Sequence, residues 1–232
     1  MLWNSTSKLR FPERPWTALP KGDGRGKLFV NCVGPNGGGK SRFGRLLALN
    51  DPEAYTFIGE GGRFIGSVFP TFGWGSVGRY ATQCGGADNL EKATIMEAIY
   101  RLCQTPLHIY LDGIMVTDVR ETYWEVCLGV VKNFGRKSLI IVMDYPLQTC
   151  LDRIYARNGG VGIREDKVEL KYNNLQKNSR LWEERIAAGA PVRLHRERTE
   201  GVEEMLLSMH SVMNEVAGEE VLPALAEEEM SA

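Results

Sequence analysis

Eight residues in the first quarter of the chain constrain its fold more than any other feature. They read Gly-Pro-Asn-Gly-Gly-Gly-Lys-Ser at positions 34–41 and match the pattern G-x-x-x-x-G-K-[ST]. An apolar run, Leu28–Val33, comes directly before them, and an amphipathic stretch from about Lys40 to Leu49 follows. Between a strand and a helix, glycines let backbone N–H groups curl around a phosphate, and the positive end of the helix faces the anion. The sequence therefore predicts a site for a nucleoside triphosphate.

Each member of this glycine loop has an expected part in holding ATP. Lys40 is expected to reach the β- and γ-phosphates, and the hydroxyl of Ser41 to hold Mg²⁺. The candidate cofactor-binding residues are Gly34, Pro35, Asn36, Gly37, Gly38, Gly39, Lys40 and Ser41. ATP and Mg²⁺ are thus the predicted cofactors.

Strands and helices are predicted to alternate along the chain. Apolar runs predict five strands, at Leu28–Val33, Tyr55–Ile58, His108–Leu111, Leu139–Met143 and Pro191–His195. Helices are predicted at about 40–49, 89–103, 119–133, 147–157, 166–188 and 202–216. Strands separated by helices imply a parallel sheet with right-handed crossovers. The predicted fold class is α/β, a three-layer α/β/α sandwich with a five-stranded parallel sheet.

Charge and composition divide the chain into three parts. Residues 1–26 form a predicted irregular basic arm, 27–216 one folded domain with a long glycine-dense loop at 59–86, and 217–232 an acidic tail. No Lys or Arg follows Arg198, and the residues up to it carry 28 basic and 20 acidic side chains, a net charge of +8. A basic body suits a polyphosphate ligand and permits nucleic acid as a partner. A solvated acidic final helix is the simpler alternative for the C-terminal charge.

Composition also excludes several kinds of site. No run of 18 apolar residues is present, so no membrane span is expected. The five cysteines include no C-x-x-C pair, and the three histidines lie far apart. A disulfide framework, a zinc knuckle and a histidine-built metal site are therefore not expected, and a reducing cytoplasm is the natural compartment.

Asp112 is the leading candidate for catalysis. It follows the third predicted strand directly, and ligands of parallel sheets lie beyond the carboxyl ends of the strands. A carboxylate there can hold Mg²⁺ together with Ser41, or accept the proton of an attacking hydroxyl. The alternative is an Asp-Gly turn whose side chain only hydrogen-bonds local backbone.

Five further residues are candidates for binding an acceptor. Glu60 ends the second predicted strand, and Arg63 is positioned to grip an anionic acceptor, although a polar turn with one exposed salt bridge explains both equally well. A second stretch combines a cation, an aromatic ring and a carboxylate in Arg79, Tyr80 and Asp88. Tyr80 is expected to stack on a base and Asp88 to bind its polar edge. Alternatively, Asp88 caps the next helix.

Three arginines flank a glycine-rich hinge at 158–162. Arg153 and Arg157 lie one helical turn apart on one face, and Arg164 follows the hinge. A mobile basic flap at about 157–166 is predicted to close over the transferring phosphate, neutralise charge and expel water. All three arginines are therefore candidate catalytic residues, with a solvated basic face as the competing interpretation.

Taken together, these segments resemble the thymidylate-kinase branch of P-loop kinases over about residues 27–216. The resemblance rests on VGPNGGGKS, FIGEGGR, IYLDG and MDYPLQTCLDRIYARNGG. Within that branch, RYATQCGGADNLEK followed by HIYLDGIMV looks most similar to bacteriophage DNA kinases that act on 5-hydroxymethyluracil.

The resemblance implies a P-loop NTPase fold of the nucleotide-kinase type. It implies an ATP-dependent enzyme that phosphorylates the hydroxymethyl group of 5-hydroxymethyluracil within viral DNA, a step in thymidine hypermodification and evasion of restriction. By the same resemblance, Gly34–Ser41 bind ATP, Asp112 is the base, and Arg153, Arg157 and Arg164 are flap cations. The implied partner is DNA, and the implied location is the host cytoplasm.

Two other functions remain open from the residues. A deoxynucleoside monophosphate kinase keeps the fold and changes the acceptor to a free nucleotide, with Arg63 or Arg79 binding its phosphate. A non-catalytic nucleotide-dependent switch binds ATP or GTP without transferring phosphate, although it has less need of the flap arginines. A homodimer is also open, with Trp124 and Val131 as residues that face the partner subunit.

Overall fold

The computed structural model describes residues 9–80, 86–88, 90–113, 120–161 and 163–222. Within these residues the strands are β1 Glu13–Pro15, β2 Leu28–Val33, β3 Tyr55–Ile58, β4 Phe64–Phe69, β5 Trp74–Val77, β6 His108–Asp112, β7 Lys137–Met143 and β8 Arg193–Glu197. The long helices are α1 Arg42–Asn50, α2 Lys92–Cys103, α4 Arg120–Phe134, α5 Leu147–Arg157, α6 Glu165–Ala187 and α7 Val202–Ala217. Short 3₁₀ helices are η2 Trp16–Ala18, η3 Glu60–Gly62 and η4 Pro70–Phe72.

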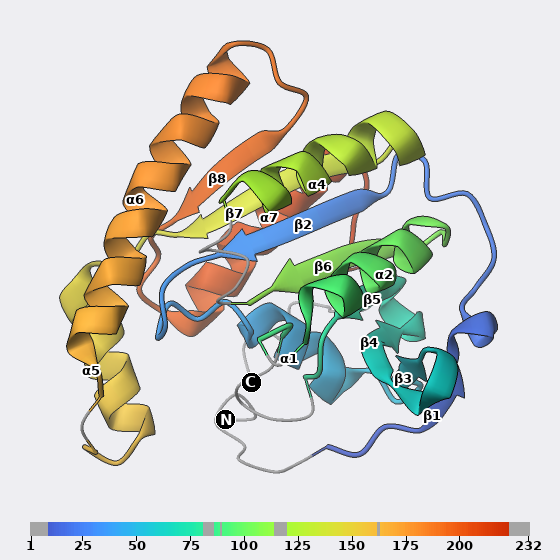
Figure 1. Cartoon of the computed structure of the whole chain (residues 1–232), viewed down its shortest axis with the longest axis horizontal. Helices are drawn as coiled ribbons and strands as arrows, with labels where there is room; N and C mark the ends of the chain where they lie inside the picture. Colours follow the sequence, from blue (N-terminus) through green and yellow to red (C-terminus); the bar gives the residue numbers. More distant parts are fainter. Residues whose placement is uncertain (1–8, 81–85, 89, 114–119, 162, 223–232) are drawn as a thin grey trace.

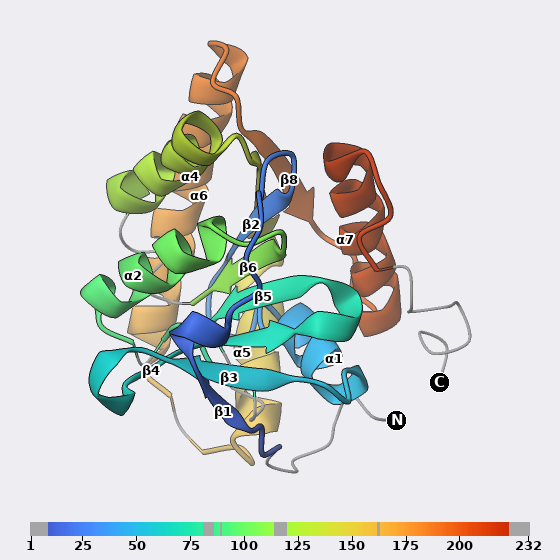
Figure 2. The same cartoon turned by 90° about the vertical axis from the view of Figure 1, so that its right-hand side faces the viewer.

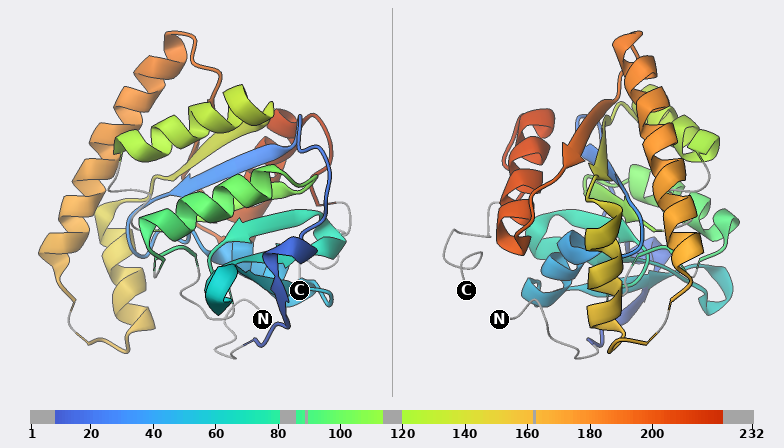
Figure 3. Two further views of the ribbon diagram at one scale, coloured as in Figure 1. Left: turned by 45° about the vertical axis from the view of Figure 1, so that its right-hand side comes forward. Right: turned by 90° about the vertical axis from the view of Figure 1, so that its left-hand side faces the viewer.

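Helices cover both faces of one central sheet (Figures 1 and 2). On one face α2, α4 and α6 bury residues such as Ile95, Trp124 and Trp182 against the strands. On the other face α1 and α7 bury Phe43 and Met209. The right-hand view of Figure 3 looks along the layers, with α7 on one side and α6 on the other. The predicted α/β class is confirmed, because each face of the sheet has its own apolar cluster and its own helices.

The sheet has more strands than the sequence predicts. All five predicted strands form, but β1, β4 and β5 join them, and the described strands lie in the order β1-β3-β4-β5-β6-β2-β7-β8. Strand β4 is antiparallel to both of its neighbours, while the other pairs are parallel. The expectation of five strands, all parallel, is therefore wrong.

The error lies in the glycine-dense stretch 59–86, which forms β4 and β5 rather than one long loop. A Cβ on Gly66 would lie 2.3 Å from the backbone oxygen of Ser76 on the neighbouring strand. A Cβ on Gly75 would lie 2.6 Å from a methyl group of Leu102 on α2. Glycine at these positions allows the strands and the helix to pack closely. The high frequency of glycine in this stretch is therefore not a sign of a loop.

The N-terminal arm is also more ordered than predicted. Within the arm, expected to be irregular throughout, β1 pairs in parallel with β3 at the edge of the sheet. The guanidinium of Arg101 lies 3.5 Å from the centre of the Trp16 ring and fixes η2 against α2. Pro12 precedes this strand and Pro15 is its last residue, and proline limits further pairing at a sheet edge.

The predicted helices all form, and their ends differ from the predicted ones by at most three residues. The helix α4 does not leave Trp124 free for a partner subunit, because that side chain is buried against the sheet and Val131 packs beside it. Trp124 therefore has no exposed surface for a dimer interface, whereas Val131 is only partly buried. Among the helices in the described ranges, none combines the length and apolarity needed to cross a bilayer.

A buried histidine lies at the amino edge of the sheet. His108 begins β6, and its Nδ1 accepts a hydrogen bond from the backbone N–H of Leu28 at 3.1 Å. Its Nε2 is 3.4 Å from Glu219, which also pairs with Lys27. Burial, with a smaller contribution from the charge of Lys27, lowers the pKa of His108 from 6.5 to about 4. Between these two pKa values His108 is therefore neutral in the folded protein and protonated in the unfolded chain.

This difference predicts that stability falls as the pH is lowered from about 6.5 to about 4, the window between the two pKa values of His108. Only the unfolded state binds the proton in that window, so acid favours unfolding, by roughly 3 kcal/mol in total. We expect His108→Asn, which keeps an acceptor for the Leu28 N–H, to flatten the pH dependence of urea unfolding in this range. Identical pH profiles for the variant and the original chain would contradict the prediction.

Candidate active site

The glycine loop, Gly34–Ser41, joins β2 to α1 at the carboxyl edge of the sheet, as Figure 1 shows. Gly37 and Gly39 have φ values of 78° and 86°, which side chains disfavour. A Cβ on Gly37 would also lie 2.3 Å from the backbone oxygen of Cys150 on α5. Both the turn and the close approach of α5 therefore require glycine here.

Lys40 folds back over this loop. Its ammonium group donates hydrogen bonds to the backbone oxygens of Gly34 at 2.9 Å and Pro35 at 3.0 Å, and the residue is only 8% exposed. The hydroxyl of Tyr110, on β6, donates to the backbone oxygen of Lys40 and ties the loop to the sheet. Among the described residues, the hydrogen-bond acceptors of this ammonium are neutral carbonyls, which an anion can replace.

Asp112 is brought to the same loop because β2 and β6 are neighbours in the sheet, with Cys32 opposite Asp112. The hydroxyl of Ser41 donates to Oδ2 of Asp112 at 2.6 Å. The hydroxyl of Tyr80 donates to Oδ1. Asp112 is fully buried, and that burial raises its pKa, while the hydrogen bonds from Ser41 and Tyr80 oppose the rise. A carboxylate of raised pKa is better suited to accept a proton near neutral pH.

Tyr80 lies in a different environment from the one expected. Its ring is fully buried and packs near Phe69 and Tyr110, inside the apolar cluster under α1. Gly44 on α1 makes room for it, since a Cβ there would lie 2.2 Å from the ring. Because both faces of the ring are covered by protein, no nucleic-acid base can stack on it, and the predicted stacking role does not fit. The sequence did not predict the contact between Tyr80 and Asp112.

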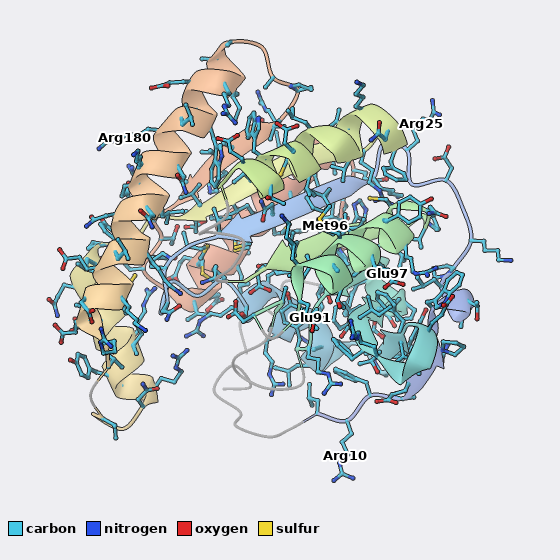
Figure 4. All side chains as sticks on the ribbon, viewed as in Figure 1. Arg10, Arg25, Glu91, Met96, Glu97 and Arg180 are labelled. Atoms are coloured by element: carbon cyan, nitrogen blue, oxygen red, sulfur yellow. The ribbon has the colours of Figure 1, made fainter. Side chains whose placement is uncertain are left out.

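The other predicted acceptor residues lie at the carboxyl edge but are not gathered into one cluster. Glu60 is exposed in η3, and Arg63 forms a 3.3 Å ion pair with Glu91 at the start of α2, a residue labelled in Figure 4. The guanidinium of Arg79 lies 4.2 Å from the centre of the Phe64 ring.

Asp88 is exposed, and a Cβ on Gly113 would lie 3.0 Å from its carboxylate, so it is near the end of β6. Glu91, and not Asp88, stands at the N-cap position of α2. The alternative in which Asp88 caps the helix is therefore wrong. Residues 81–85 of the predicted acceptor stretch lie outside the described residues, as do residue 162 of the flap and 223–232 of the acidic tail.

The three flap arginines occupy different positions. Arg153 is half-buried, packs 4.3 Å from the centre of the Tyr145 ring and donates to the backbone oxygen of Glu200 at 3.2 Å. Arg157 is exposed at the end of α5. Arg164 is exposed and forms a 2.7 Å ion pair with Asp166 at the start of α6.

Sequence reasoning missed a second arginine beside Arg153. Arg42 is the first residue of α1, directly after Ser41, and its pKa is lowered mainly by burial and then by the nearby positive charge of Arg153. The two cations lie on the β7 and α5 side of the glycine loop, whereas Asp112 lies on the β6 side. The position of Arg42 immediately after the Lys-Ser pair was the available signal.

The oxygen atoms of Ser41 and Asp112 fit the predicted magnesium ion. Mg²⁺ prefers hard oxygen ligands and usually takes only one or two from the protein, with the rest from phosphates and water. The 2.6 Å contact places a hydroxyl and a carboxylate side by side at the glycine loop. In the described ranges no group of three or more His, Cys, Asp or Glu is arranged to hold a metal on its own.

A carboxylate joined to a glycine loop at the edge of an α/β sheet is compatible with an enzyme that transfers phosphate. The chain belongs to the 5-hmdU DNA kinase family, because residues 14–207 match the model of that family. It is 28% identical over 156 residues to 5-hmdU DNA kinase 1 of Salmonella phage ViI, a match that covers 67% of this chain and 70% of the relative.

Two further relatives carry the same name. The 5-hmdU DNA kinase of Pseudomonas phage M6 is 27% identical over 175 residues, which cover 71% of this chain and 89% of the relative. The 5-hmdU DNA kinase of Bacillus phage SP10 is 26% identical over 160 residues, which cover 67% of this chain but only 25% of that longer protein. Family membership makes the chain a kinase, a phosphotransferase.

Proposed function

We propose that this protein transfers the γ-phosphate of ATP to the hydroxymethyl group of 5-hydroxymethyluracil in phage DNA. The family match supports the acceptor. The observation that carries the chemistry is the 2.6 Å contact between Ser41 and Asp112, because it joins a buried carboxylate to the phosphate loop. In this proposal the protein is a P-loop kinase of the thymidylate-kinase branch, uses ATP with Mg²⁺, and acts in the host cytoplasm in thymidine hypermodification that evades restriction.

The donor is held by the glycine loop. Backbone N–H groups of the loop and the N-terminus of α1 bind the phosphates, and Lys40 exchanges its two carbonyl partners for phosphate oxygens. Ser41 and Asp112 would hold Mg²⁺, which neutralises phosphate charge when bound. Arg42 and Arg153, two cations on the β7 and α5 side of the loop, would neutralise further phosphate charge.

The transfer itself needs positioning and one proton acceptor. The hydroxymethyl oxygen attacks the γ-phosphorus, a bond forms between them, and the bond from phosphorus to the bridging oxygen of ADP breaks. Asp112 accepts the proton that the hydroxyl loses. Arg157 and Arg164 act from the flap, where Arg164 must leave its ion pair with Asp166 to contact phosphate.

The acceptor approaches along the carboxyl edge of the sheet. Because Asp112 is fully buried, the base must be single-stranded or flipped out of the duplex for its hydroxyl to reach the donor. Glu60, Arg63, Arg79 and Asp88 are the proposed acceptor-binding residues. Of these, Arg79 has no carboxylate within ion-pair distance among the described residues, which makes it the best suited to a DNA phosphate.

The test is a transfer assay with γ-labelled ATP and matched acceptors. We expect label on DNA that contains 5-hydroxymethyluracil and none on the same DNA with thymine, which lacks the hydroxyl. Label on free deoxynucleoside monophosphates, with none on either polymer, would replace the proposal by a monophosphate kinase. Nucleotide binding with no transfer to any acceptor would leave a nucleotide-dependent switch.

A further inference from the structure

A buried tyrosine holds the carboxylate that the proposed mechanism uses. The hydroxyl of Tyr80 donates to one oxygen of Asp112, and Ser41 donates to the other at 2.6 Å. With one hydrogen bond on each oxygen, rotation of the carboxylate about its Cβ–Cγ bond would break both. A hydrogen bond to an ionised carboxylate is also about twice as strong as one between neutral groups.

Tyr80 is itself held from three directions. The ring fits against Gly44, where a Cβ would lie 2.2 Å away. The guanidinium of Arg45 donates to the backbone oxygen of Tyr80 at 2.8 Å. The backbone N–H of Gly86 donates to Arg79 at 2.9 Å, which fixes the residue immediately before the tyrosine.

Gly86 and Ala87 also lie against Asp112. The backbone N–H of Ala87 donates to the backbone oxygen of Asp112 at 2.8 Å. A Cβ on Gly86 would lie 2.5 Å from Oδ1, the oxygen that Tyr80 contacts. The glycine at this position and the tyrosine earlier in the segment therefore shape one space for the carboxylate.

A tyrosine in this site is a donor and not a reacting group. Its hydroxyl is directed at Oδ1 of Asp112, where it donates a hydrogen bond. The ring is also fully buried, which leaves it no surface for substrate.

We propose that Tyr80 is a positioning residue, which fixes the carboxylate of Asp112 against the phosphate loop so that it meets the acceptor hydroxyl in one orientation. The inference rests on the proposed function, since Asp112 matters only if phosphate is transferred. It assigns Tyr80 a role in the reaction in place of the predicted contact with a base.

The first test is Tyr80→Phe, which removes only the hydroxyl. We expect kcat for transfer to 5-hydroxymethyluracil DNA to fall roughly 10- to 100-fold, the usual cost of a misplaced catalytic group. The KM values for ATP and DNA should stay within about twofold, because neither ligand touches Tyr80. Tyr55→Phe is the matched control, a buried tyrosine of β3 outside the site, and it should leave kcat unchanged. An unchanged kcat in Tyr80→Phe would overturn the inference.

A double-mutant cycle that combines Tyr80→Phe with Asp112→Asn distinguishes a role of Tyr80 in positioning Asp112 from a role in stabilising the fold. If Tyr80 acts through Asp112, the double variant should be no slower than Asp112→Asn alone. If Tyr80 only supports the fold, its substitution should cost the same factor in both backgrounds, which would overturn the inference. The double variant can be compared with Asp112→Asn even if Tyr80→Phe alone folds poorly, because it leaves an amide and not a charge unpaired. A double variant clearly slower than Asp112→Asn would then overturn the inference.

The two proposals fail in different ways. Absence of transfer by the original chain to 5-hydroxymethyluracil DNA overturns the proposed function. Transfer by the original chain combined with additive losses in the cycle overturns only the role of Tyr80.

Discussion

Replacing Asp112 by Asn is expected to lower phosphate transfer to 5-hydroxymethyluracil DNA roughly a hundredfold or more, the typical contribution of a proton acceptor. The amide keeps the size of the side chain and an oxygen that can accept from Ser41, but it cannot take the proton of the acceptor hydroxyl. ATP affinity should change little, because the glycine loop and Lys40 make most of the contacts to phosphate. Titration calorimetry with ATP and single-turnover transfer measure the two effects separately.

The control for this variant is Asp51→Asn. Asp51 is also a buried carboxylate with hydrogen-bond partners, accepting from Thr71 at 2.9 Å, but it lies at the far end of α1. Its replacement should reduce stability without changing kcat at temperatures where the protein remains folded. Equal turnover in Asp112→Asn and the original chain would remove Asp112 from the mechanism.

Replacing Lys40 by Ala is expected to weaken ATP binding roughly 10- to 100-fold, the loss typical of hydrogen bonds from a charged group. Transfer should fall further still, since Lys40 also neutralises charge that develops on the moving phosphate. Folding should be preserved, because the hydrogen bonds of the Lys40 ammonium among the described residues go to two backbone oxygens of its own loop.

Lys132→Ala provides the comparison for Lys40, since this exposed lysine of α4 lies near the amino edge of the sheet. It removes the same charge from the chain without touching the glycine loop. Unchanged ATP affinity in Lys40→Ala would show that the loop is not the donor site, and the assignment of every other nucleotide contact would then fail with it.

Local patterns predicted most of the elements but not the sheet as a whole. The five predicted strands and six helices form because each depends on apolar spacing within a few residues. Strands β4 and β5 were not predicted because glycine is common in loops. Here a larger side chain at Gly66 would collide with Ser76 on β5, and one at Gly75 would collide with Leu102 on α2. Contacts between segments far apart in the chain produce no periodic pattern in the amino-acid sequence, so these two strands could not be predicted from it.

The candidate site also contains residues that the sequence predicts and residues that only the tertiary structure places. A loop motif and a strand-end carboxylate are local features, so the amino-acid sequence is enough to propose the glycine loop and Asp112 as partners. Tyr80 could not be placed, because its burial depends on Gly44 of α1, and Arg164 could not be predicted to pair with Asp166 from its charge alone.

By itself, the sequence determined that this protein is built of strands and helices and that a glycine loop joins a buried strand to a helix. Only the tertiary structure decided that Tyr80 points inward to Asp112, that Arg42 lies beside Arg153, and that the sheet extends to eight strands in the described residues. The reason is physical. Backbone geometry follows from neighbouring residues, whereas the direction and partners of a side chain depend on the space that distant segments leave for it.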